Sequence, residues 1–199
     1  MLVKLFKRIS AVAVGLLLFT TALAQQQQQK KEWKDRAEWE LYNSIVQATD
    51  ANQKLQLLEQ WKQKYPQTDF QEERWLLYTQ TYQQLNRAQD MWNAAVELLK
   101  INPDNIQGLY YITSLTVSMA DTSPDRMALG DKCARHLLDK LRTLPKPEKL
   151  SDADWQKQKT AIEIVAYTTL GWVAMNQKNH LEAEKHFREV LNRNPRNGQ

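Results

Sequence analysis

The sequence predicts an all-α fold for most of its length, and three observations support this. From about Lys31 to Leu191 apolar residues recur every three or four positions, which is the period of an amphipathic helix. No stretch alternates apolar and polar residues for long enough to indicate a strand. Only five glycines and six prolines occur in 199 residues, while Gln, Leu, Ala, Glu and Lys are plentiful, as expected for a chain made mostly of helices.

Polar turns divide this region into eight predicted helices. They are expected near residues 32–48, 51–64, 69–85, 88–101, 104–120, 124–143, 152–176 and 179–193. Because the turns between successive helices are short, neighbouring helices are expected to run antiparallel. The sequence therefore predicts about four helical hairpins in a row.

Four of the predicted helix starts carry a residue that is favoured as an N-cap, which are Thr68, Asn102, Ser123 and Ser151. Gln71 follows Thr68 at the spacing of a capping box. Pro103 and Pro124 stand where the first residue of a helix is expected, and proline is tolerated there because that N–H has no partner within the helix.

The first 24 residues are typical of a secretory signal peptide. They begin with basic residues, continue with an apolar run of roughly 15 residues and end in Ala22-Leu23-Ala24. We expect cleavage after Ala24, followed by a flexible polar leader at 25–31, a helical domain at 32–195 and a tail at 196–199. An uncleaved membrane anchor is the alternative, although the apolar run is shorter than the roughly 20 residues that span a bilayer.

The charge of the chain follows from this segment. Three of the 27 basic residues and none of the 23 acidic ones lie in residues 1–24, so the remainder carries 24 basic and 23 acidic side chains. Basic and acidic residues are interleaved along it, which argues against a nucleic-acid-binding face. The only cysteine is Cys133, so neither an internal disulfide nor lipidation of a cysteine after Ala24 is expected, and Cys133 itself is predicted to be buried.

A repeated pattern links two parts of the chain. Tyr167, Leu170 and Gly171 are followed by Ala183, Phe187 and Pro195 in one stretch. The same spacing recurs upstream, in a second set that consists of Trp75, Tyr78, Thr79, Tyr82, Met91, Ala95 and Pro103. The interval from Trp75 to Pro103 equals that from Tyr167 to Pro195, so the two stretches form equivalent units.

This pattern resembles the tetratricopeptide repeat (TPR), whose signature is W-x2-L-G-x2-Y, then A-x3-F, then a closing proline. Ala174 departs from it where an aromatic residue is expected. The resemblance covers roughly residues 35–195, with two weaker units near Leu58 to Pro66 and Leu109 to Pro145. It implies a right-handed α-solenoid of about four antiparallel hairpins, in which Gly171 allows close helix packing and Phe187 fills the space between the helices.

The sequence contains no motif for catalysis, a cofactor or a metal. It lacks G-x-S-x-G, a P-loop, H-E-x-x-H and a glycine-rich phosphate loop. His180 and His186 lie six positions apart, about 120° around a helix, and both are predicted to face water. The pair formed by Glu182 and His186 offers two ligands, whereas zinc needs at least three, and His136 lies in another hairpin. We therefore predict a protein that is not an enzyme.

The resemblance implies that the first helix of each hairpin lines a concave surface that receives a peptide or a partner protein. The outward positions of those helices are Trp39, Asn43, Leu76, Gln80, Gln83, Tyr110, Ser114, Val117, Trp172 and Met175. Their aromatic, amide and apolar side chains carry no charge and suit an extended or helical polypeptide.

The sequence thus predicts an exported protein-interaction scaffold of the cell envelope, whose only contact with a membrane is through its signal peptide. The segment from Leu57 to Phe70 also looks like the helix end and turn of periplasmic repeat proteins. Two alternatives stay open at this point. One is an enzyme whose active site is dispersed over several helices, and the other is a repeat protein that self-assembles through the end faces of its stack.

Overall fold

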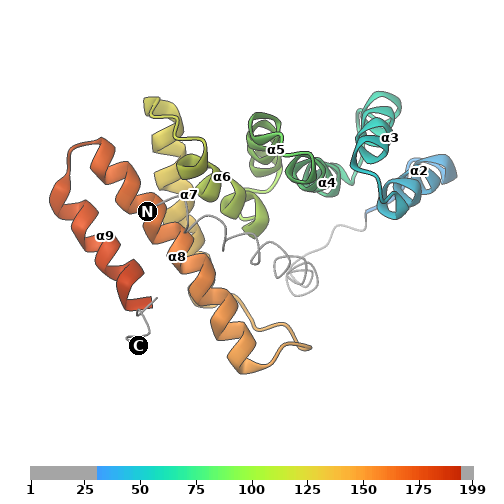
Figure 1. Ribbon diagram of the computed structural model, residues 1–199. Coiled ribbons are helices and arrows are strands. Elements are labelled where there is room, and N and C mark those ends of the chain that lie inside the picture. The colour runs from blue at the N-terminus through green and yellow to red at the C-terminus, as the bar shows by residue number, and fades with distance from the viewer. Residues whose placement is uncertain (1–30, 194–199) are drawn as a thin grey trace. The chain divides into compact units, whose positions relative to one another are not determined.

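A computed structural model describes residues 31–193, and every regular element in that range is an α-helix (Figure 1). The helices are α2 (Arg36–Gln47), α3 (Ala51–Lys64), α4 (Gln71–Gln84), α5 (Ala88–Ile101), α6 (Ile106–Ser118), α7 (Pro124–Thr143), α8 (Asp152–Asn176) and α9 (His180–Arg193). The eight predicted helices are confirmed, with boundaries that agree within four residues. The predicted signal peptide, most of the leader, Pro195 and the tail lie outside the described residues.

The described chain divides into two compact units at Thr116, within α6. We call residues 31–115 the N-terminal unit and residues 116–193 the C-terminal unit. In the N-terminal unit α3 packs against both α2 and α4, and α4 packs against α5. In the C-terminal unit α8 packs against both α7 and α9. The all-α, TPR-like fold class predicted from the sequence is confirmed.

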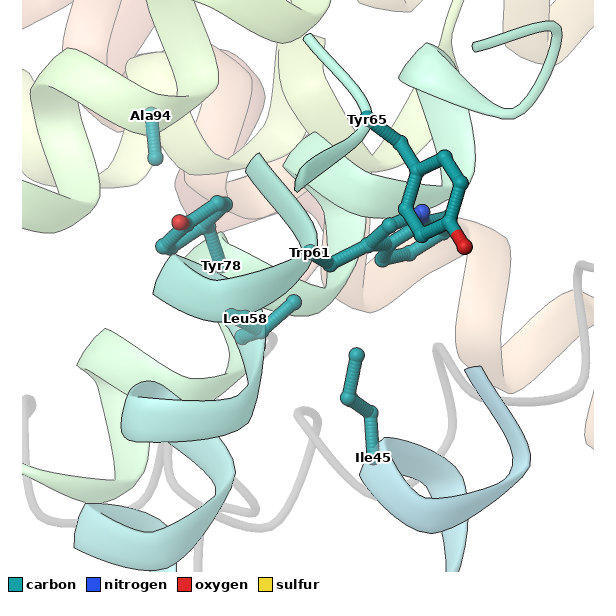
Figure 2. Close-up of a cluster of buried hydrophobic side chains, with 6 residues drawn as sticks. All are labelled: Ile45, Leu58, Trp61, Tyr65, Tyr78 and Ala94. Carbon is teal, nitrogen blue, oxygen red and sulfur yellow. The ribbon is translucent and has the colours of Figure 1, made fainter. Parts of the chain in front are cut away.

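The core of the N-terminal unit is aromatic. Its buried side chains are drawn in Figure 2 and comprise Ile45, Leu58, Trp61, Tyr65, Tyr78 and Ala94. Trp33, which precedes α2, stacks on Phe70 with ring centroids 3.6 Å apart and so closes one side of this core. Large aromatic rings bury much apolar area each, and this unit relies on them to hold short helices together.

A buried carboxylate lies at the edge of this core. Glu38 in α2 is fully buried, and its Oε1 accepts a hydrogen bond of 2.9 Å from the indole Nε1 of Trp61 in α3. Its Oε2 accepts a second one of 2.8 Å from the backbone N–H of Lys34. Both oxygens therefore have partners, as a buried carboxylate requires. The bond from Trp61 ties the start of α2 to the last turn of α3, and the bond from Lys34 holds the residues just before α2.

Arg74 in α4 is also buried, with 4% of its surface exposed. Its Nη1 donates to the carbonyl oxygen of Tyr65 at 2.7 Å, and its Nη2 donates to that of Pro66 at 3.3 Å. These bonds satisfy carbonyl groups just past the end of α3, where no helical N–H is available. Arg74 thereby fixes the turn that joins α3 to α4.

The C-terminal unit shows the contacts that the repeat pattern predicts. Ala183 is fully buried, and Leu170 is 2% exposed. A methyl group added at Gly171 would come within 2.7 Å of the Phe187 ring, so this ring can lie so close to α8 only because the helix carries glycine there. The predicted role of Gly171 in close packing is confirmed, while Phe187 stays 36% exposed.

The turns after α4 and α8 have the same geometry. Asn86 and Lys178 adopt left-handed backbone angles, with φ of 55° and 61°. In each turn the following residue donates its N–H to a carbonyl five positions back, Arg87 to Tyr82 and Asn179 to Ala174, both at 2.9 Å. This is the Schellman ending of a helix. The interval from Asn86 to Lys178 equals that from Trp75 to Tyr167, so the two hairpins are in the register that the repeat pattern predicts.

The predicted N-cap residues have mixed outcomes. Ser151 accepts from the backbone N–H of Asp154 at 3.1 Å, as predicted. Ser123 precedes Pro124 at the start of α7, but its side chain makes no capping bond. The Thr68 hydroxyl accepts from the N–H of Phe70, which precedes the first residue of α4, Gln71. Thr68 therefore does not cap α4, and the predicted capping box is wrong.

Asn102 also differs from the prediction. It follows the last residue of α5, and its side chain donates to Glu72 Oε1 at 2.7 Å. The residue that caps α6 is Asn105, whose Oδ1 accepts from the N–H of Gly108 at 2.9 Å. The amides of both asparagines around Pro103 donate to Glu72 Oε1, but the Oδ1 of Asn102 accepts from the N–H of Asp104, before α6, and only that of Asn105 accepts from the first turn of α6.

Candidate functional site

The predicted partner-binding residues of the N-terminal unit differ in exposure. Trp39 on α2 is 47% exposed, whereas Asn43 and three residues of α4, namely Leu76, Gln80 and Gln83, are half-buried. The Asn43 amide donates to the carbonyl oxygen of Trp39 within its own helix. Gln83 accepts a bond of 3.4 Å from the hydroxyl of Tyr111. Trp39 is thus the member of this set that offers most of its side chain to a ligand.

Tyr110 and Ser114 on α6 are less available than predicted. Tyr110 is only 4% exposed, and burial raises its pKa to about 12. Its predicted outward position is therefore wrong, because the face of α6 that carries it is packed against protein. Ser114 is half-buried, and its hydroxyl donates to the carbonyl oxygen of Tyr111 at 3.1 Å.

The remaining three predicted residues belong to the C-terminal unit. Val117 and Trp172 are half-buried, and Met175 is 45% exposed. Trp172 and Met175 lie three positions apart on α8, near its C-terminal end. The ten predicted residues are therefore divided between two units that are described separately, and each unit has to be considered as a binding surface by itself.

Shallow hollows are found on the first hairpin of the N-terminal unit. One runs along α3 and is lined by Asn52, Leu55, Gln56, Glu59, Gln60 and Gln63. A second lies between α2 and α3 and is lined by Ala37, Leu41, Gln60, Gln63 and Lys64. A third, at the start of α2, includes Trp39. Gln60 and Gln63 belong to the first two hollows, which therefore form one continuous surface.

We call this surface the α3 amide surface and define it by four amides and two leucines, which are Asn52, Gln56, Gln60, Gln63, Leu41 and Leu55. The four amides are exposed, and among the described residues none of their side chains makes a hydrogen bond. The two leucines are half-buried and lie with the amides in the hollows. Each amide can donate and accept at the same time.

The nearest charged residues do not dominate this surface. Glu59 accepts a hydrogen bond of 2.9 Å from the hydroxyl of Tyr78, which holds its carboxylate toward the core. Lys64 lies at the far end of α3, with its ammonium 5.3 Å from the centre of the Tyr65 ring. The surface therefore presents neutral amides beside apolar side chains, together with one acid and one base of opposite charge.

The sequence contains a signal for this surface that the prediction did not use. Asn52, Gln56, Gln60 and Gln63 are spaced by four, four and three residues, so they occupy one face of a helix. A stripe of amides on a helix is usually a solvated face, and the prediction considered only the first helix of each hairpin. The surface instead belongs mainly to α3, the second helix of its hairpin.

The described residues show no arrangement that suggests a metal site or a membrane span. Nowhere in residues 31–193 do three or more His, Cys, Asp or Glu side chains converge as metal ligands. No helix in this range is both long enough and apolar enough to cross a bilayer. Cys133 is buried as predicted, and burial raises its pKa to about 12, so the thiol is protonated at neutral pH.

His186 corrects the prediction that both histidines of α9 face water. His180 is exposed, but His186 is 5% exposed and lies with its ring centroid 6.1 Å from that of Tyr167 in α8. Its Nε2 is 3.1 Å from Glu182 Oε1, yet neither ring nitrogen has a hydrogen-bond partner with suitable geometry in the described chain. Position 186 falls on the face of α9 that packs against α8, which the histidine pattern alone did not reveal.

The pKa of His186 is lowered from its ordinary value of 6.5, chiefly because burial removes water from the ring. Glu182 and Asp131 act in the opposite direction, while Arg135 and Lys185 lower the pKa further. Since the native ring binds its proton less well than the unfolded chain does, the unfolded state gains protons first as the pH falls. The stability of the native state should therefore decrease as the pH drops below 6.5.

This pH dependence can be measured by urea unfolding between about pH 7.5 and about pH 5.5, a range in which few carboxylates titrate. We expect the unfolding midpoint of His186→Phe to fall much less over this pH range than that of the wild-type protein. His180→Gln, a change at an exposed position of the same helix, should keep the wild-type decrease. Equal pH slopes in the wild-type protein and His186→Phe would contradict the assignment to His186.

The geometry defines the class of this chain as an all-α protein made of TPR-like helical hairpins. Comparison with family models agrees, because the tetratricopeptide repeat model matches residues 164–197. The match begins inside α8 and includes all of α9, and its length is that of one repeat. It supports a TPR protein and covers the repeat pattern that runs from Tyr167 to Pro195 and includes Gly171 and Phe187. No curated protein and no solved structure matches the chain.

Proposed function

We propose that this protein is a non-enzymatic scaffold of the cell envelope that binds an extended peptide segment of a partner protein on the α3 amide surface. The matched repeat supports this, because TPR domains generally mediate protein–protein interactions. The observation that carries the proposal is the set of four exposed amides without hydrogen-bond partners, placed beside Leu41 and Leu55.

The chemistry of the surface favours a peptide over a charged ligand. Peptide N–H and C=O groups require both acceptors and donors, and each side-chain amide supplies both. Leu41 and Leu55 provide apolar contact for alternate side chains of an extended segment, which face one side of the strand. The hollows are lined by one acid, Glu59, and one base, Lys64, so their lining has no net charge that would select an acidic or a basic ligand.

The groove residues predicted on the first helices form part of the proposal where they remain accessible. Trp39 lines the separate hollow at the start of α2, about 200° around that helix from Leu41, and would form a second contact of the same unit. Asn43, Leu76, Gln80 and Gln83 are half-buried neighbours in the same unit. Val117, Trp172 and Met175 would belong to a separate contact on the C-terminal unit.

Site-specific photo-crosslinking in living cells tests the binding surface. A photoreactive amino acid at Gln60, and separately at Gln63, should give the same crosslinked species, since both residues line both hollows. Gln84 and Gln156 are exposed glutamines on α4 and α8 that line none of the three hollows, and they serve as matched controls. The surface is wrong if the species also forms at the controls or forms at neither test position.

The location in the cell envelope rests on residues 1–24 and needs its own test. Fractionation of cells that produce the full chain should place it outside the cytoplasm, and its first residue should be Gln25. A product in the cytoplasm that retains Lys4 would contradict export. Failure of export would not contradict the binding surface, which the crosslinking experiment tests separately.

A further inference from the structure

A stripe of four exposed residues runs along the outer side of α9. We call it the α9 outer stripe and define it as Leu181, Glu184, Arg188 and Leu191. Leu181 is 83% exposed and Leu191 is 59% exposed, which is unusual for leucines of a helix in a packed repeat. The spacing of three, four and three residues keeps the four side chains on one face.

This stripe lies opposite the face of α9 that is packed. Ala183 and His186 are buried, and Val190 and Arg193 are half-buried, so these four residues mark the inner face. With 100° per residue, the centre of the inner face and the centre of the stripe are on opposite sides of the helix. Figure 1 shows α9 lying along α8, which accounts for the buried side alone. Nothing in the described chain covers the stripe.

The order of residues in the stripe is self-complementary. The leucines are at its ends, and between them are an acid and a base, with Arg188 Nη2 at 2.6 Å from Glu184 Oε1. If a second α9 runs antiparallel about a two-fold axis at the level of residue 186, position 181 faces position 191 and position 184 faces position 188. Each leucine then meets a leucine, and each glutamate meets an arginine.

We propose that the α9 outer stripe is the interface of a symmetric dimer, in which α9 of a second copy of this chain packs antiparallel on it. A two-fold interface requires a surface that complements itself. The stripe meets this requirement, because Leu181 faces Leu191 and Glu184 faces Arg188 about the same axis. The burial of both leucines drives association, and the crossed Glu184 and Arg188 pairs fix its register and orientation. The charges disfavour a parallel arrangement, in which like residues would face one another.

The dimer is a weak one. A single pair of 14-residue helices buries less than the roughly 1,200 Å² at which stable interfaces begin. Association should therefore become visible at protein concentrations on the order of 100 µM, with rapid exchange between monomer and dimer. The proposal is independent of the α3 amide surface, because the stripe belongs to the C-terminal unit and each copy keeps its own N-terminal unit.

Charge exchange between two variants tests this interface. In Glu184→Arg alone the facing pairs become Arg–Arg, and in Arg188→Glu alone they become Glu–Glu, so each variant should remain monomeric in sedimentation equilibrium. When the two variants are mixed, both facing pairs again join an acid to a base. We expect the mixture to recover association as a heterodimer at the concentration at which the wild-type protein dimerises. Neither variant contains the Glu184–Arg188 pair within its own helix, so recovery can come only from contact between chains.

Matched changes at another exposed pair serve as the control. Arg36 and Glu40 on α2 also form an ion pair at a spacing of four, with Arg36 Nε 2.7 Å from Glu40 Oε1. Arg36→Glu and Glu40→Arg should each dimerise as the wild-type protein does. Unchanged far-UV circular dichroism of all variants confirms that they are folded. The proposal is overturned if the wild-type protein is monomeric up to about 500 µM, if Glu184→Arg dimerises like the wild-type protein, or if the mixture stays monomeric.

Discussion

Replacing Trp61 with alanine should lower the free energy of unfolding of the N-terminal unit by about 3–5 kcal/mol, which is the usual cost of removing a buried large aromatic side chain. Trp61 is fully buried in the core of Figure 2 and contacts residues from α2 and α4. Its loss leaves a cavity and also removes the donor that Glu38 Oε1 uses. We expect the unfolding midpoint in urea to fall strongly, as followed by circular dichroism.

Trp61→Phe separates the hydrogen bond from the packing. It keeps an aromatic ring in the core but leaves Glu38 Oε1 buried without the indole N–H, which should cost about 1–3 kcal/mol. Trp75→Phe is the matched control, because Trp75 is half-buried and its indole makes no hydrogen bond among the described residues. If both variants lose the same stability, the bond to Glu38 contributes nothing beyond the packing of the ring.

The positions of the helices could be predicted from the sequence because local signals determine them. Apolar periodicity, Pro124 at the start of α7 and Ser151 before α8 all act within a few residues of the boundary that they mark. Asn102 was wrongly assigned because its Oδ1 accepts from the N–H of Asp104 and not from the first turn of α6, and both asparagines around Pro103 also bond to Glu72, a distant contact that no local rule reports. Glu38 shows the same limit, since an acid near a helix start looks solvent-exposed until Trp61 is placed beside it.

The candidate site could be predicted only in part, for a related reason. Helical periodicity indicates which residues share a face, but not which neighbouring helix covers that face. Trp39 is exposed as expected, while Tyr110 is buried although it occupies the corresponding position in its hairpin. The amides of α3 were visible as a stripe in the sequence, yet their freedom from partners and their position beside Leu41 are properties of the packed hairpin.

Gly130→Ala should reduce the stability of the C-terminal unit by about 2–3 kcal/mol, toward the upper end of the cost of overpacking a core. In an exposed helix interior, alanine would be favoured over glycine by about 1 kcal/mol. At Gly130 a Cβ atom would lie 2.2 Å from Thr116 Oγ1, 2.5 Å from its Cγ2 and 2.9 Å from its Cβ. Rotation of the threonine cannot move its own Cβ, so α6 and α7 would have to separate locally.

Gly171→Ala provides the contrast that isolates this effect. There the added atom would meet three atoms of the Phe187 ring at 2.7–2.9 Å, but the ring is 36% exposed and can swing toward solvent. The clash and the gain in helix propensity should then nearly offset each other, leaving a change within about 1 kcal/mol. Thr116→Ala should recover part of the loss caused by Gly130→Ala, because it removes two of the three contacting atoms. A double-mutant cycle from urea unfolding measures this coupling, and a Gly130→Ala variant as stable as the wild-type protein would show that the two helices are not held this close.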